Sequence, residues 1–119
     1  MTVQRFHGPD LNFWRGRRVL LTGHTGFKGS WLAFWLLELG AEVTGVALPP
    51  EPRANLFDAL GLAAGLHHRI GDIRDPSVLR EAVAACRPEV VLHLAAQPLV
   101  RLSYAEPVAT WESNVMGTI

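Results

Sequence analysis

A glycine-rich loop joins an apolar strand to an apolar helix near the start of this chain. The loop reads TGHTGFKG over residues 22–29, with a hydrophobic run at 18–21 before it and another at 27–39 after it. Strand, glycine loop and helix in this order are typical of loops that hold the phosphates of a nucleotide. This unit constrains the fold because it needs a strand buried in a sheet and a helix packed across it.

Each glycine of the loop has an expected physical role. Gly23 permits a tight turn at positive φ. Gly26 lets the backbone approach a pyrophosphate, and Gly29 lets the helix lie close to the strand. The unpaired N–H groups of the helix would then point at the anion, together with the positive end of the helix dipole. We therefore predict a cofactor-binding loop at these positions.

The rest of the chain alternates strands and helices. Apolar runs predict strands at 17–22, 42–48, 67–70 and 89–96, and helical spacing predicts helices at 27–39, 54–62, 76–87 and from about 107 onward. Asp75 is the expected N-cap of the third helix, and Gly40 is the expected C-terminal cap of the first. This order predicts an α/β fold, a doubly wound parallel sheet with its ligand beyond the carboxyl ends of the strands.

Composition restricts the classes of partner. The 119 residues carry 11 basic and 11 acidic side chains, so there is no electrostatic case for nucleic acid or for an acidic membrane surface. The single cysteine, Cys86, excludes an internal disulfide and fits a reducing compartment. The run at 27–39 is shorter than the roughly 20 residues that span a bilayer. No signal-peptide pattern opens the chain, so we expect a cytoplasmic protein.

Several segments together resemble a known group of enzymes. The spacing TGxxGxxG, followed by GDIRD at 71–75, HLAA at 93–96 and NVMGT at 114–118, resembles the extended short-chain dehydrogenase/reductase superfamily of nucleotide-sugar epimerases and dehydratases. Within it, residues 23–32 and 94–104 resemble CDP-glucose 4,6-dehydratases. The resemblance covers about residues 13–119 and implies a Rossmann-type sheet, of which this chain holds the N-terminal part.

The resemblance also assigns candidate site residues. It implies that the cofactor is held by the loop, by the segment after the third strand and by the end of the fourth strand: Gly23, Thr25, Gly26, Phe27, Lys28, Gly29, Asp72, Ile73, Leu94, Ala95 and Ala96. Asp72 would hydrogen-bond adenine and Ile73 would contact it. Substrate-binding candidates just beyond the fourth strand are Gln97, Arg101 and Ser103. No metal site is predicted, because His67 and His68 lack further ligands.

The activity implied by the resemblance is an intramolecular redox lyase. In CDP-glucose 4,6-dehydratases, NAD takes a hydride from C4 of the glucose unit of CDP-glucose, water is lost, and the hydride returns to C6. The acid that usually binds the cofactor ribose at the end of the second strand is replaced by Ala47, so NADP stays open beside NAD. A related sugar nucleotide is an alternative substrate, and the whole enzyme is expected to form a homo-oligomer.

The catalytic pair of the superfamily is missing from these residues. A Tyr-x-x-x-Lys pair performs acid–base chemistry there, but the only tyrosine is Tyr104 and Val108 stands four residues later. We therefore expect an N-terminal fragment of a longer enzyme, inactive alone. It divides into a segment 1–16 that leads into the domain and an NAD(P)-binding domain at 17–119. Another superfamily member, such as an epimerase, and a nucleotide-binding module without redox activity remain alternatives.

Individual residues carry further expectations. His24 and Lys28 could face the phosphates, the adenosine ribose or solvent, whereas His93 is expected to be a packed core residue. Asn114 could brace the backbone near the fourth strand, and Cys86 is expected to be buried. The first helix is apolar almost all round, so we expect it to need cover from more than one neighbour and the isolated chain to self-associate.

Overall fold

The computed structural model describes residues 7–119 and contains a four-stranded parallel sheet. The strands are β1 (Arg18–Thr22), β2 (Glu42–Ala47), β3 (His67–Ile70) and β4 (Val90–His93), in the spatial order β3-β2-β1-β4. Chain order reverses beside β1, since β2 and β3 extend the sheet on one side and β4 on the other. The doubly wound arrangement predicted from the sequence is confirmed, and the switch point lies between β1 and β4.

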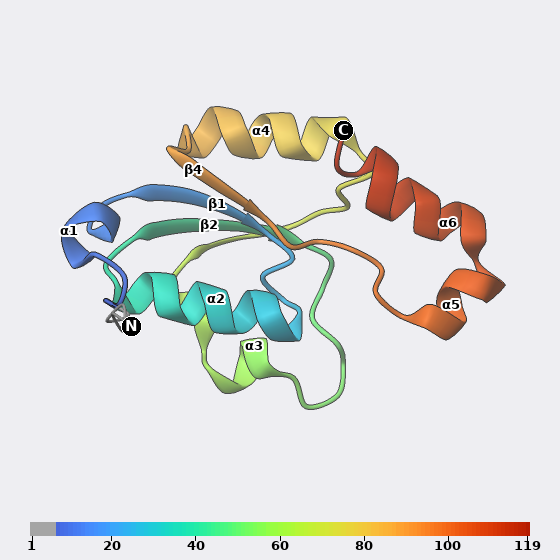
Figure 1. Ribbon diagram of the computed structural model, residues 1–119, viewed down its shortest axis with the longest axis horizontal. Coiled ribbons are helices and arrows are strands. Elements are labelled where there is room, and N and C mark those ends of the chain that lie inside the picture. Colours follow the sequence, from blue (N-terminus) through green and yellow to red (C-terminus); the bar gives the residue numbers. More distant parts are fainter. Residues whose placement is uncertain (1–6) are drawn as a thin grey trace, which may run out of the picture.

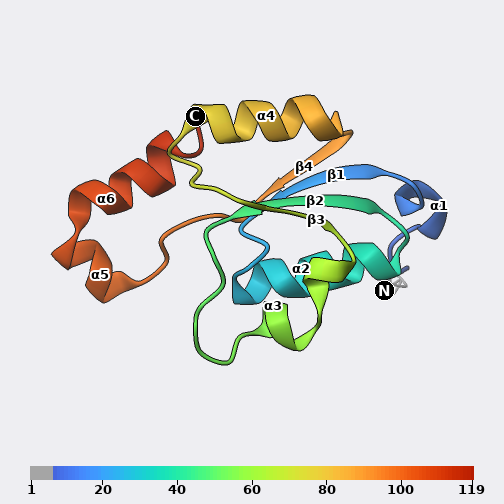
Figure 2. The ribbon, with the colours of Figure 1, turned by 180° about the vertical axis from the view of Figure 1, so that it is seen from behind.

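Helices cover both faces of the sheet (Figures 1 and 2). One layer holds α2 (Phe27–Glu38), α3 (Leu56–Ala59) and the 3₁₀ turn η1 (Leu62–Ala64), and the opposite layer holds α4 (Pro76–Cys86). A short helix α1 (Leu11–Trp14) precedes β1. Beyond β4 follow α5 (Val100–Ala105), α6 (Pro107–Trp111) and a π-helical turn η2 (Glu112–Met116), which lie past the carboxyl ends of the strands.

The central strand β1 contributes to two separate cores. Val19 and Leu21 pack with Leu36 of α2 and Phe57 of α3, whereas Leu20 packs with Val46 and Ala82 toward α4. Side chains alternate across a strand, so three consecutive apolar residues place hydrophobic groups on both faces. This is why a continuous apolar run predicted a strand buried on both sides.

Helix ends follow the local sequence. The Asp75 carboxylate accepts a hydrogen bond from the Ser77 backbone N–H, and Pro76 starts α4, as expected of an N-cap followed by proline. Gly40 has a φ of +82° directly after α2, which confirms the predicted C-terminal cap. Helix α4 ends at Cys86, and Arg87 takes the left-handed conformation at φ +43° before Pro88.

Several predicted elements differ from those in the structure. The second strand stops at Ala47, because Leu48 already turns into solvent, and the fourth spans Val90–His93 within the predicted 89–96. The predicted helix at 54–62 divides into α3 and η1, separated by Gly61 at φ +61°. The segment 1–16 contains α1, which its sequence did not reveal, and its residues 1–6 lie outside the described structure. Helix α5 was also missed.

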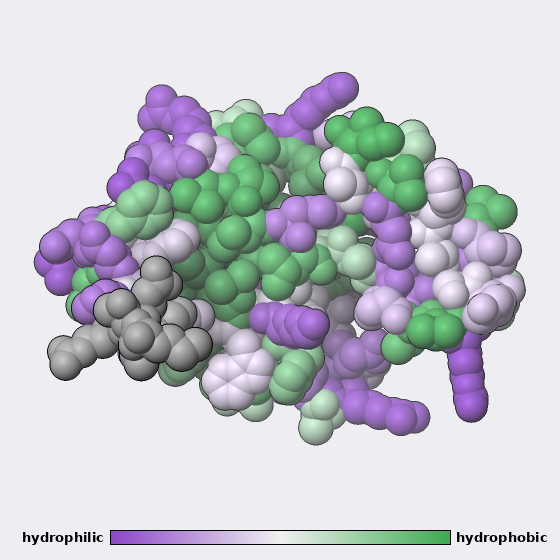
Figure 3. Space-filling view, in the orientation of Figure 1, coloured by the Kyte–Doolittle hydropathy of each residue, from purple (hydrophilic) through white to green (hydrophobic). Residues whose placement is uncertain are grey.

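Helix α2 is less covered than its composition suggested. Gly29, Ser30, Ala33 and Leu36 face the sheet and are buried, but Phe27, Trp31 and Trp35 are at least half exposed. The expectation of more than one neighbour holds only for its inner side, where β1, β2, α3 and η1 lie. Hydrophobic residues gather over β4 and α2 on the face shown in Figure 3. Among residues 7–119, no helix is long and apolar enough to cross a bilayer.

Candidate functional site

Three segments meet at the carboxyl edge of the sheet, beside the switch point. They are the glycine loop after β1, residues 71–75 after β3 and residues 94–97 after β4. Gly23 lies directly against the end of β4, where a Cβ built on Gly23 would be 2.7 Å from the Ala95 backbone nitrogen. The predicted convergence of the loop with this segment is therefore found in the structure.

The glycines of the loop are required by its geometry. Gly23 has a φ of +79°, and any side chain there would strike Leu94 and Ala95. A Cβ on Gly29 would overlap the carbonyl oxygen of Gly23, because the first turn of α2 lies directly on the loop backbone. Gly26 differs, since its nearest atom to an added Cβ is the Gly23 carbonyl oxygen at 3.4 Å. The loop backbone is thus tightly packed at Gly23 and Gly29, whereas Gly26 has free space beside it and is the open part of the loop.

Hydrogen bonds fix the loop to its surroundings. The Gly23 N–H donates to the Val46 carbonyl at 2.9 Å, and the Thr25 hydroxyl donates to the Leu48 carbonyl at 2.9 Å. The buried Ser30 hydroxyl donates to the His24 carbonyl at 2.9 Å. Gly26 is the N-cap of α2 and brings no capping side chain. The first N–H groups of α2 therefore remain available to an anion at the open part of the loop.

His24 lies beneath the loop, although the sequence suggested the phosphates or solvent. Its ring is fully buried and its Nε2 lies 2.7 Å from Nδ1 of His68 on β3. Burial, followed by repulsion from His68, lowers the pKa of His24 from 6.5 to about 4. His24 is therefore neutral near pH 7 and cannot serve as a cationic phosphate ligand. Lys28 does lie on the exposed surface of the loop.

The end of β2 offers no carboxylate to a ribose. Ala47 is buried, Leu48 is 58% exposed, and the Ala47 carbonyl accepts the Gly71 N–H at 2.9 Å. Arg53 lies on the exposed link between β2 and α3. The edge near the expected ribose position is thus built from backbone and apolar side chains.

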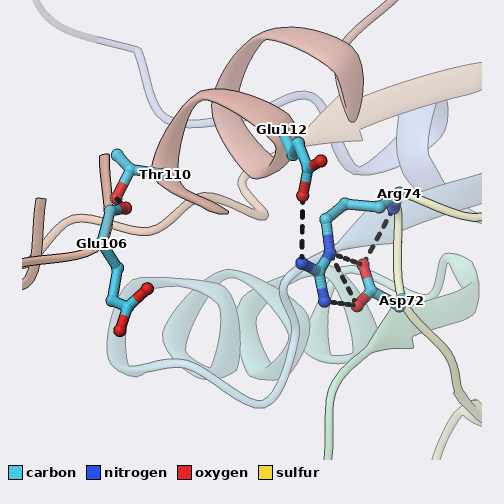
Figure 4. A network of polar contacts seen from close by, with 5 residues as sticks. All are labelled: Asp72, Arg74, Glu106, Thr110 and Glu112. Atoms are coloured by element: carbon cyan, nitrogen blue, oxygen red, sulfur yellow. Dashed lines mark hydrogen bonds and ion pairs between the residues drawn. The ribbon is translucent and has the colours of Figure 1, made fainter. Parts of the chain in front are cut away.

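Asp72 belongs to a network of charges at the start of the segment after β3 (Figure 4). Its carboxylate accepts hydrogen bonds from Arg74 Nη2 at 2.6 Å and from the Arg74 backbone N–H at 2.9 Å. The Arg74 side chain holds the pKa of Asp72 below its usual value. Arg74 also pairs with Glu112 of η2 at 3.6 Å, so the network joins this segment to the last turn of the chain.

Ile73 points into the protein. Only 9% of its surface is exposed, and an added Cβ on Gly117 would lie 2.6 Å from Ile73 Cδ1. Gly117 therefore allows the end of η2 to pack closely against the segment after β3. The predicted contact of Ile73 with adenine would involve the small part of the side chain that stays accessible.

The ends of β1 and β4 are joined by side chains. The buried Thr22 hydroxyl lies 2.6 Å from His93 Nδ1 and accepts hydrogen bonds from the backbone N–H groups of Leu94 and Ala95, both at 3.1 Å. His93 Nε2 lies 3.2 Å from the Thr118 hydroxyl. The expectation of a packed core histidine was wrong, because the His93 ring is exposed at the carboxyl edge and is held there by hydrogen bonds.

Asn114 braces the backbone after β4, as predicted. Its Oδ1 accepts the Gln97 N–H at 2.7 Å, and its Nδ2 donates to the Gln97 carbonyl at 3.1 Å. The Gln97 side-chain oxygen accepts the Leu99 N–H, and its Nε2 donates to the Leu99 carbonyl. The same Nε2 donates to the Thr110 hydroxyl at 3.1 Å. This side chain therefore shapes the loop that leads into α5.

The remaining candidates lie on α5. Arg101 is exposed, and the half-buried Ser103 hydroxyl donates to the Val100 carbonyl at 2.6 Å. Tyr104 is 84% exposed.

Cys86, the last residue of α4, is only half-buried at the edge of the core, although the sequence predicted it to be buried. No group of three potential metal ligands occurs within residues 7–119.

Comparison with known proteins identifies the family. A sequence model of the family described as GDP-mannose 4,6 dehydratase matches residues 20–119. The chain belongs to this family. It is 54% identical over 110 residues to a CDP-glucose 4,6-dehydratase of Salmonella typhimurium, which covers 92% of this chain. It is also 33% identical over 105 residues to a UDP-glucose 4-epimerase of Neisseria meningitidis. The resemblance to nucleotide-sugar dehydratases and epimerases is thereby confirmed.

Solved structures of family relatives share the fold. A UDP-glucose 4-epimerase of Thermotoga maritima, solved with UDP-glucose, superimposes with a TM-score of 0.72 at 30% identity over 84% of this chain. A UDP-glucose-4-epimerase of Stenotrophomonas maltophila, with bound NAD and formylated UDP-arabinopyranose, gives 0.71 at 28% identity over 86%. The chain spans 31% of the length of each of these two structures and of the Salmonella relative.

Some residues that shape the site were not found from the sequence. Thr22, Thr118 and Arg74 act through hydrogen bonds or ion pairs between segments far apart in the chain, and no local spacing reveals such partners. The alternation of β1 does place Thr22 inside the sheet, so its hydroxyl needed a partner there. That requirement was the one available signal.

Proposed function

We propose that this chain is the cofactor-binding part of a nucleotide-sugar dehydratase that converts CDP-glucose to CDP-4-keto-6-deoxyglucose. The observation that carries the proposal is the glycine loop itself. It lies against Ala95 at the switch point, its helix has no capping side chain, and Gly26 leaves its outer side open. The similarity to the Salmonella CDP-glucose 4,6-dehydratase supports the choice of substrate.

The loop fits a dinucleotide diphosphate. Gly26 leaves space where phosphate oxygens would approach, and the N–H groups at the start of α2 would donate to them. Thr25, Phe27 and Lys28 line the same loop, and Lys28 is an exposed cation there. Gly23 and Gly29 keep the backbone in the shape that this contact needs. We propose these residues as the diphosphate site.

The two ends of the dinucleotide would lie over the other segments at this edge. Asp72 and Ile73 would hold the adenine end, with the carboxylate kept ionised by Arg74. Leu94, Ala95 and Ala96 would border the nicotinamide end, beside the Gly23 turn. When bound, NAD supplies the hydride acceptor for C4 oxidation and the donor for C6. We keep NAD as the cofactor with NADP open, because the end of β2 presents neither an acid nor a basic cluster.

The sugar nucleotide would approach past β4. Arg101 is exposed near this edge and suits a substrate diphosphate, with Ser103 and Gln97 forming the loop around it. A tyrosine–lysine pair is needed for acid–base chemistry, and Tyr104 has no lysine at the required spacing. These 119 residues contain no such pair, and we propose that residues 17–119 bind the cofactor without turning over substrate. We further propose a cytoplasmic homo-oligomer for the whole enzyme.

An epimerase is the second candidate, supported by the similarity to UDP-glucose 4-epimerases. The two reactions differ in the mass of the product, because dehydration removes water and epimerisation does not. The full gene product should be incubated separately with CDP-glucose and UDP-glucose and the products weighed by mass spectrometry. Loss of one water from CDP-glucose is the expected result. An isomer of unchanged mass would reject the dehydratase in favour of the epimerase. If neither CDP-glucose nor UDP-glucose gives a product, the result favours a nucleotide-binding module without redox activity.

A further inference from the structure

His24 occupies an unusual place for a polar residue of a phosphate loop. Its ring is fully buried under the loop and stands edge-on to the rings of Phe57 and His68, with centroid distances of 5.4 and 4.9 Å. Gly45 of β2 makes room for it, because a Cβ at that position would overlap the His24 ring. The loop, β2 and β3 are thus in contact through one side chain.

A hydrogen bond joins the rings of the two histidines. His24 Nε2 and His68 Nδ1 lie 2.7 Å apart, so one of them must carry the proton. The Val46 carbonyl also acts on the His24 ring as a hydrogen-bond acceptor that raises its pKa. The proton between the two rings comes from His24 Nε2 in one tautomer and from His68 Nδ1 in the other, so the bond is present in both.

The same residue holds the loop through its backbone. The His24 carbonyl accepts the Ser30 hydroxyl of α2 at 2.9 Å, while the preceding residue, Gly23, donates to β2 at Val46. His24 consequently connects the loop to the first turn of α2 by its carbonyl and to β3 by its ring. Any tilt of the ring would shift the backbone on which the open Gly26 depends.

We propose that His24 and His68 are a positioning pair that sets the glycine loop for the diphosphate of the cofactor. This inference rests on the proposed function, since it assumes that the loop binds a dinucleotide. Neither ring would contact the cofactor: His24 lies under the loop and His68 lies on β3. The hydrogen bond to His68 constrains the rotation of the His24 ring in addition to its edge-on packing against Phe57. The pair thereby adds a directional constraint that a purely apolar filling would lack.

Substitutions can separate the hydrogen bond from the filling of space. His24→Phe keeps a buried ring over Gly45 but removes one partner of the hydrogen bond, and His68→Leu removes the other. His68→Asn places an amide close to the position of Nδ1, and because an amide can donate or accept it should restore the bond. His67→Leu is the matched control, because His67 is the exposed neighbour on the same strand. NAD affinity and melting temperature are measured for each variant of the full gene product.

We expect His24→Phe and His68→Leu each to weaken NAD binding about tenfold, as loss of one directional hydrogen bond would. Their melting temperatures should fall by only a few degrees, because one buried hydrogen bond is lost while the fold is kept. His68→Asn and His67→Leu should bind within about twofold of wild type, and the double variant His24→Phe/His68→Leu should be no weaker than either single one, because both remove the same bond.

Each other outcome has a clear meaning. If the wild type binds neither NAD nor NADP, the proposed function itself fails. If the wild type binds and His24→Phe binds equally well, the ring only fills space and the positioning role is overturned. It is also overturned if His68→Asn loses as much affinity as His68→Leu. Should His24→Phe not fold, the comparison of His68→Leu with His68→Asn decides, since His68 is only half-buried.

Discussion

The Thr22 hydroxyl lies 2.6 Å from His93 Nδ1, at the point where β1 and β4 both end. Thr22 Oγ1 already accepts two backbone N–H groups, from Leu94 and Ala95, so its own proton is donated to His93. His93 then carries its proton on Nε2, which donates to the Thr118 hydroxyl at 3.2 Å. This chain of donors fixes the two strand ends that border the proposed cofactor site.

Replacing the hydroxyl should therefore loosen the end of β4. Thr22→Val keeps the shape of the side chain but leaves the Ala95 N–H without its acceptor, and we expect a loss of about 1–3 kcal/mol in the free energy of unfolding. Thr22→Ser is the matched control, because it keeps the hydroxyl. Urea unfolding of both variants measures the difference. Equal loss in the two would show that the methyl group, not the hydroxyl, matters.

The glycines should fall into two classes. Gly29→Ala is expected to disrupt the loop, since its Cβ would overlap the Gly23 carbonyl, and the protein should lose stability and NAD binding together. Gly26→Ala meets its nearest atom only at 3.4 Å, so the fold should survive while NAD binding weakens by about tenfold or more. Gly8→Ala, in open space, is the control. Calorimetric titration and melting curves distinguish the classes. Unchanged NAD affinity in Gly26→Ala would contradict the proposed diphosphate site.

Acid should destabilise the protein through His24. Its pKa is about 4 when folded and 6.5 in its ordinary state, so between these values the unfolded chain binds a proton that the folded chain does not. The contribution of neutral His24 to the free energy of unfolding is fully present above pH 6.5. It is lost as the pH falls toward 4, by about 3 kcal/mol at most. Unfolding measured from pH 7 to 4.5 should show this slope, and His24→Phe should flatten it. An identical slope in the variant would contradict the burial of a neutral His24.

Sequence reasoning worked best where one residue meets one local requirement. Gly23, Gly40 and Asp75 each occupy the turn or cap that their chemistry predicted. It failed where a side chain finds its partner far away. His24 was expected to face the cofactor or solvent, yet His68, 44 positions later, gives it a buried partner. His93 was expected in a core, yet Thr22 and Thr118 hold it at an exposed edge. Helix α5 was missed because its hydrophobic residues face solvent and show no buried stripe.

The aromatic face of α2 should make the 119-residue chain associate with itself. Trp31 and Trp35 are about half exposed, at 50% and 51%, and line a hollow of about 470 Å³ with Phe34. We expect Trp31→Lys/Trp35→Lys to reduce association in sedimentation experiments without lowering the melting temperature, because both side chains already contact solvent. A wild-type chain that sediments as a monomer at high concentration would contradict this prediction.

The most direct test of the proposed function follows a single hydrogen atom. CDP-glucose carrying deuterium at C4 should be converted by the full gene product, and the product examined by nuclear magnetic resonance. We expect CDP-4-keto-6-deoxyglucose with the deuterium at C6, since the cofactor held by the glycine loop would return the hydride within one turnover. A product that retains its C6 hydroxyl, or one whose C6 carries only solvent hydrogen, would contradict the proposed dehydratase reaction.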